Sequence, residues 1–183
     1  SGRITKNEGQ YLLSFCNNTS PAFIINFVVW KTLGQEQMLV PSLIILFGVP
    51  VLLSFFFRRF YLRGKKQFHS PVELPDDQNR ALNFSILDTC MMDSFESIIK
   101  VGGYIISFSI LLSLCRDIGN LPAVNLLLPS LEVTNGVVML RESIRDPRLY
   151  YPLIIGLTSF GGFCSVAQTD CMLQGTEISI LPY

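Results

Sequence analysis

The chain has 183 residues, of which 49% are hydrophobic and 15% are charged, and its 14 basic and 14 acidic residues cancel. Soluble domains carry roughly 25% charged residues, so this composition excludes an ordinary soluble domain and a disordered segment. A net charge of zero also leaves no basic excess that would drive nucleic-acid binding. We therefore expect a polytopic membrane protein.

The first apolar segment is interrupted by polar residues. A short helix is expected to begin near Lys6, and it leads into the polar stretch 16–21, which ends at Pro21. The apolar piece 22–30 that follows is too short to cross the roughly 30 Å hydrocarbon core of a bilayer. The two pieces together predict a broken helix.

Longer apolar runs at 37–57, 98–115 and 121–140 are three candidate membrane spans. Basic residues follow the first and the third run, so the positive-inside rule predicts that the loops 58–97 and 141–148 are cytoplasmic.

Residues 67–97 are expected to form a cytoplasmic loop and an amphipathic helix within the single membrane domain. The helix covers 82–99 and is expected to lie on the membrane or on the bundle, because its apolar positions can share a face.

A second interrupted segment follows the last basic cluster. The apolar run 149–155 leads into Ser159-Phe-Gly-Gly-Phe-Cys-Ser165, where small residues break the apolar pattern. Two broken segments of similar design, at 15–21 and 159–165, therefore flank the candidate spans. The sequence predicts an all-α, polytopic membrane helix bundle with broken or re-entrant helices.

Broken helices persist at membrane depth only where they are buried in protein or line a wet cavity. Transporters use such breaks to present helix N-termini and polar side chains to a solute. We therefore expect the solute-binding residues at the breaks and in the polar centre of the run 121–140. They are Asn17, Asn18, Thr19, Ser20, Thr134, Asn135, Ser159, Gly161, Gly162, Ser165 and Gln168.

Glu132 is an ionisable residue inside an apolar run, which makes it a candidate to bind a coupled proton or cation. Structural interpretations stay open beside these functional ones. The polar residues at 17–19 could cap helix ends, Gly161 and Gly162 could allow a close helix crossing, and Glu132 could lie near a membrane surface.

Nothing in the sequence predicts an enzyme or a cofactor. The single histidine, His69, falls in a polar stretch, and the five cysteines show neither metal-ligand spacing nor a disulfide framework. We expect free thiols, no metal site and no cofactor.

Three motifs occur in order along the chain, at Ile4–Ile25, Leu131–Gly136 and Ser159–Gln168. Together they resemble the YlbJ-type sporulation integral membrane proteins, a nucleoside-recognition or Gate-domain family. The resemblance implies that residues 1–183 are the C-terminal part of a longer Gate-like transporter fold. It implies no catalytic residues.

The resemblance also implies transport during sporulation, in a bacterial cell or forespore membrane. The expected solute is small and anionic, with dipicolinate the leading candidate. One alternative is a nucleoside transporter-like permease. Another is a non-transporting scaffold that recruits sporulation membrane partners through 67–97. The expected partners are the lipid bilayer, the solute and further membrane proteins or copies of the chain, and not nucleic acid.

Overall fold

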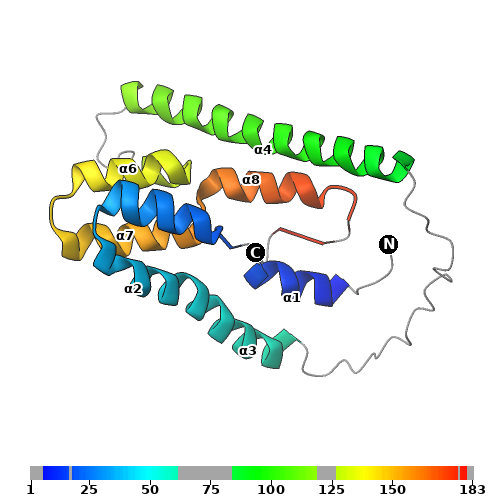
Figure 1. Cartoon of the computed structure of the whole chain (residues 1–183), viewed down its shortest axis with the longest axis horizontal. Coiled ribbons are helices and arrows are strands. Elements are labelled where there is room, and N and C mark those ends of the chain that lie inside the picture. The colour runs from blue at the N-terminus through cyan, green and yellow to red at the C-terminus, as the bar shows by residue number, and fades with distance from the viewer. Residues whose placement is uncertain (1–5, 17, 62–83, 119–126, 177, 181–183) are drawn as a thin grey trace.

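The computed structural model describes residues 6–16, 18–61, 84–118, 127–176 and 178–180, and every regular element in these ranges is a helix. Figure 1 shows their arrangement. The helices are α1 (Lys6–Cys16), the π-helical η1 (Phe23–Leu33), η2 (Glu36–Met38), α2 (Leu39–Leu43), η3 (Ile44–Gly48), α3 (Val49–Tyr61), α4 (Phe84–Ile118), η4 (Leu128–Ser130), α6 (Val133–Ser143), α7 (Pro147–Phe160) and α8 (Gly162–Leu173).

Three helical stretches are long and apolar enough to cross a membrane: Glu36–Arg59, Phe84–Arg116 and Pro147–Leu173. The first joins η2, α2, η3 and α3, and the third joins α7 and α8 across a break. The predicted all-α membrane bundle with broken helices is confirmed, and so is the span expected at 37–57.

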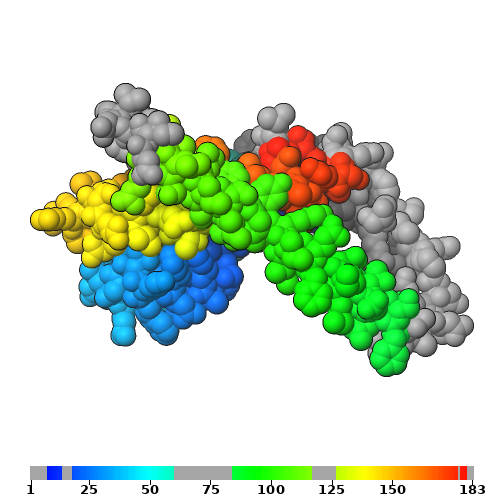
Figure 2. All heavy atoms as spheres, turned by 90° about the horizontal axis from the view of Figure 1, so that it is seen from above, coloured from blue at the N-terminus to red at the C-terminus, as the bar shows by residue number. Residues whose placement is uncertain are grey.

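The spans after residue 80 differ from their prediction. The amphipathic helix and the span expected at 98–115 form one helix, α4, whose 35 residues extend about 52 Å. Residues 84–100 are all exposed, so this half of α4 does not lie on the bundle, and Figure 2 shows it extending away from the other helices. The expected loop at 67–83 lies outside the described residues.

The run 121–140 is not one continuous span. Its described part contains η4 and the beginning of α6, and between them Glu132 has extended backbone angles, φ −142° and ψ 126°. The helix begins anew at Val133 because the Glu132 side chain accepts hydrogen bonds from the first turn of α6. A third break therefore joins the two that the sequence predicts.

The described residues of the two basic clusters lie at opposite ends of the bundle (Figure 1). α3, which carries Arg58 and Arg59, ends at the side where α4 begins, whereas the turn from α6 to α7, which contains Arg145, lies at the other side (Figure 1). That the loops 58–97 and 141–148 are cytoplasmic stays a prediction.

Two helical hairpins pack together and form the core. η1 turns at Gly34, which adopts φ 64°, into the first span, and α6 turns through Asp146 into α7. A buried cluster joins η1, α6 and α7: Val28, Leu33, Val137, Tyr150, Ile154 and Leu157. Because the turns of both hairpins lie at one end, the N-termini of η1 and α6 both point into the middle of the bundle (Figure 1).

Candidate functional site

The three helix breaks meet around one cavity of about 170 Å³ in the middle of the bundle. We call this cavity the junction pocket. It receives residues from the first break, from the start of α6, from the α7–α8 break and from α4. They are Thr19, Phe23, Ile105, Glu132, Val133, Thr134, Gly161, Cys164, Ser165 and Gln168.

Hydrogen bonds join the breaks to one another. The Thr19 hydroxyl donates to the backbone carbonyl of Thr158 at 3.0 Å, which connects the first break to the end of α7. The backbone N–H of Cys164 donates to the carbonyl of Leu131 at 2.9 Å, which connects the start of α8 to the break before α6. Backbone groups that lose their helical hydrogen bond at one break thus find a hydrogen-bond partner at another. Such pairing is needed in the hydrocarbon core, where no water can replace the lost bond.

Glu132 is the most buried acidic side chain at the junction, with 2% of its surface exposed. Its carboxylate accepts hydrogen bonds from the backbone N–H groups of Thr134 and Asn135, both at 2.8 Å, and from the Asn135 amide at 2.9 Å. The N–H groups in the first turn of a helix have no carbonyl partner within the helix. An acceptor at this position pairs with them and complements the positive end of the helix dipole. Glu132 is therefore an N-cap of α6 that also lines the pocket.

Gly161 and Gly162 form the α7–α8 break, and both have positive φ, 78° and 79°. A Cβ atom on Gly162 would lie 3.1 Å from the carbonyl oxygen of Ser130 and 3.2 Å from the backbone nitrogen of Val133. The third break therefore packs directly against the break before α6. The close approach that the sequence left open for these glycines is present, and Gly161 lines the pocket, while solute binding by the two glycines stays a prediction.

Gly136 allows a second close approach. It is buried, and a methyl group there would overlap the carbonyl oxygen of Pro129 and press on Leu157. α6 thus lies against η4 with no room for a side chain. Sequence reasoning did not select Gly136, although it ends the motif that begins at Leu131.

The structure brings most of the predicted site residues together. Six of them line the junction pocket: Thr19, Glu132, Thr134, Gly161, Ser165 and Gln168. Gly162 packs behind it, and the exposed Asn135 joins Glu132 to Ser109 of α4 through its amide, at 3.0 Å from the Ser109 hydroxyl.

Three further predicted residues lie in the described part of the chain but do not line the pocket. Ser20 is exposed, and its hydroxyl accepts from the N–H of Phe23, a capping contact that the sequence analysis considered only for residues 17–19. Asn18 and Ser159 are exposed, and Asn17 lies outside the described residues.

Sequence reasoning missed four residues that line the pocket, Phe23, Ile105, Val133 and Cys164, and also Thr158, which is fully buried and accepts the bond from Thr19. Cys164 lies in the interrupted stretch 159–165, Thr158 directly precedes it, and Val133 lies in the motif 131–136, so these three had a signal in the sequence. Contributions from α4 depend on tertiary packing that no local pattern encodes.

In the described ranges no group of three or more His, Cys, Asp and Glu side chains is placed to hold a metal ion. Four cysteines there are free: Cys90, Cys115, Cys164 and Cys171. His69 lies outside those ranges.

The fold and the junction define a helical membrane protein whose spans are interrupted by breaks that meet in its core. Comparison of the chain with protein-family models, with curated proteins and with solved structures gave no match.

Proposed function

We propose that the chain is part of a membrane transport protein and that the junction pocket binds its solute. The observation that carries the proposal is the meeting of three helix breaks, between apolar spans, around one small cavity whose mostly apolar wall includes a few polar side chains. Breaks at membrane depth are costly, and binding sites in transporters commonly form where half-helices meet.

The pocket offers hydrogen-bonding groups of both kinds. Hydroxyl and amide groups come from Thr19, Ser165 and Gln168, and the N-termini of η1, α6 and α8 border the cavity. Helix N-termini favour negative charge, which supports a small anionic solute. The resemblance to YlbJ-type sporulation proteins makes dipicolinate the first solute to test, at a forespore membrane.

Glu132 limits how an anion binds. Its carboxylate already takes three donors at the start of α6, and a second negative charge in the same cavity would be repelled. An anionic solute would therefore bind with a proton or a cation, which keeps the coupling role of Glu132 as a part of the proposal.

The test is uptake by vesicles that contain the full-length protein, with labelled dipicolinate compared with a labelled nucleoside. Gln168→Ala and Thr19→Val should each reduce uptake by about 2- to 10-fold, because each removes one hydrogen bond worth about 0.5–1.5 kcal/mol. Ser97→Ala, at an exposed position of α4, is the matched control and should leave uptake unchanged.

Uptake of the nucleoside alone would favour the permease alternative. No uptake of either solute by folded protein would refute the proposed solutes. The scaffold alternative has one observation in its favour, the full exposure of residues 84–100. A scaffold should lose partner recruitment in Asp88→Asn and Asp93→Asn and should tolerate Gln168→Ala.

A further inference from the structure

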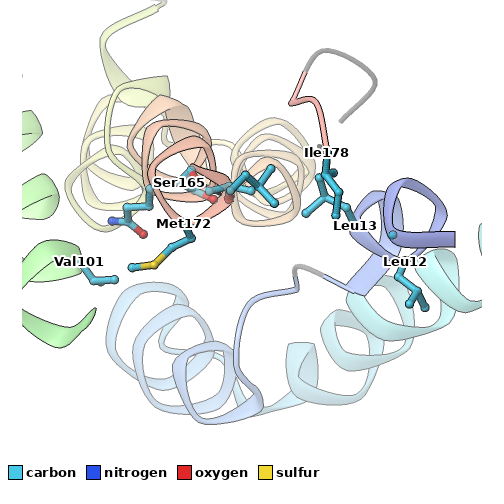
Figure 3. Close-up of a pocket in the computed structure, with 10 residues that line it drawn as sticks. Leu12, Leu13, Val101, Ser165, Met172 and Ile178 are labelled. Carbon is cyan, nitrogen blue, oxygen red and sulfur yellow. Dashed lines mark hydrogen bonds between the residues drawn. The ribbon is translucent and has the colours of Figure 1, made fainter. Parts of the chain in front are cut away.

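A second and larger cavity, of about 480 Å³, lies beside the junction pocket. We call it the chamber. Figure 3 shows side chains of α1, α4, α8 and the segment at Ile178 pointing into it. Its lining includes Leu12, Leu13, Val101, Ser165, Gln168 and Met172.

The chamber and the junction pocket share two residues, Ser165 and Gln168. These lie three positions apart on α8, so they occupy neighbouring places on one helix face. The Gln168 amide donates to the sulfur of Cys164 at 3.2 Å, which directs it toward the start of α8. The two residues therefore form the boundary between the cavities.

The chamber extends in a definite direction. α8 begins at Gly162 beside the junction, and chamber residues follow along it from Ser165 to Leu173. Figure 1 shows that α8 ends toward the same end of the bundle at which α4 begins. The chamber thus extends from the junction toward that end and away from the turns of the two hairpins.

Polar contacts hold the α1 wall in place. The Gln10 side chain donates to the carbonyl of Ser179 at 2.8 Å and accepts from its N–H at 3.2 Å, and the Tyr11 hydroxyl donates to the carbonyl of Ser54 at 3.1 Å. α1 is therefore fastened both to α3 and to the segment after α8, while Leu12 and Leu13 border the cavity.

We infer that the chamber is the route by which a small organic solute reaches the junction pocket from one side of the membrane, with Ser165 and Gln168 at its inner end. Its volume falls within the roughly 300–1,000 Å³ of small-molecule sites, which are mostly apolar and hold a few polar groups. The inference rests on the proposed function, because a route needs a solute site to reach.

Cysteine accessibility tests the route without requiring that the solute be known. Leu13→Cys and Met172→Cys are made singly in the full-length protein after its native cysteines are replaced by alanine or serine. Vesicles are treated on one side at a time with a membrane-impermeant, cationic methanethiosulfonate reagent. The controls are Leu52→Cys and Ile106→Cys, on faces of α3 and α4 that are 70% and 63% exposed and face lipid in a bundle that spans the membrane.

Both chamber cysteines should react from one side only, and at least roughly tenfold faster than the controls, because the reagent needs water and a thiolate. Gln168→Trp should slow dipicolinate uptake at the boundary while leaving the reactivity of Leu13→Cys, on the α1 wall, within about twofold of its value without the tryptophan. Uptake together with chamber cysteines that react no faster than the controls would overturn the route alone, and would mean that lipid chains fill the chamber. Reactive chamber cysteines in folded protein that takes up neither solute would overturn the proposed function, and the solute route with it.

Discussion

The cap that Glu132 places on α6 gives the sharpest prediction. In Glu132→Gln the side chain keeps one carbonyl oxygen but replaces the second acceptor by an NH₂ group. In the wild-type protein, the two carboxylate oxygens of Glu132 accept separate hydrogen bonds, one from the N–H of Thr134 and one from the N–H of Asn135. The glutamine therefore leaves one buried N–H facing another donor.

The expected loss of stability follows from these contacts. Hydrogen bonds to a charged group contribute about 1.5–3 kcal/mol, and an unsatisfied buried donor costs about 1–3 kcal/mol. Taking one lost bond as the effect, we expect about 2 kcal/mol, which corresponds to a fall in Tm of about 4–8 °C for a chain of this size. Glu132→Asp should lose less, because aspartate is a good N-cap residue.

The assay is thermal unfolding of the purified full-length protein in one detergent, with all variants scanned at the same rate. Glu142→Gln, at an exposed position of the same helix, is the control and should leave Tm within about 1 °C. An unchanged Tm in Glu132→Gln would refute the reasoning that the carboxylate holds the start of α6. A second measurement distinguishes a coupling role of Glu132 from a structural one: uptake per folded molecule as a function of pH, in the wild type and in Glu132→Gln. If Glu132 is purely structural, the pH profile of uptake should have the same shape in both proteins.

Three further substitutions test the close packing at the junction. Gly136→Ala should destabilise the protein by about 1–3 kcal/mol or more, because its methyl group would overlap backbone at Pro129; thermal unfolding measures this, and an unchanged Tm would contradict the close approach. Gly162→Ala should cost about 1–2 kcal/mol from its positive φ alone, measured in the same scans, and a gain in stability would contradict the left-handed conformation. Gly102→Ala, where no atom lies within 4 Å of the added Cβ, should instead be neutral or stabilising by up to about 1 kcal/mol, and a clear loss of stability would contradict the open position of this glycine on α4.

Local sequence patterns were sufficient for the first span and for two of the breaks. The apolar run 37–57 and the small-residue stretch 159–165 carry their structure in their own composition, so both could be predicted. The break at Glu132 could not be placed in the same way, because a hydropathy average over the run 121–140 does not register a single extended residue within it. Its position depends on a side chain that caps the following helix.

The arrangement of α4 shows a different limit. An amphipathic pattern over 82–99 and an apolar run over 98–115 suggested two elements, yet no residue at their boundary stops a helix, and α4 continues through both. Its contributions to the site, Ile105 at the pocket and Ser109 at Asn135, follow from helix packing. They are invisible in a sequence read one segment at a time.

The contacts between the breaks also bear on how such a site could open. Two hydrogen bonds between different breaks connect them, from Thr19 to Thr158 and from Cys164 to Leu131, and each contributes about 0.5–1.5 kcal/mol net. The core between η1, α6 and α7 is instead held by fully buried apolar side chains such as Val28 and Ile154. A rearrangement that moves α8 against the two hairpins would break the bond from Cys164 to Leu131 and keep this core. The lost bond itself would cost about 0.5–1.5 kcal/mol, small enough for solute binding to supply.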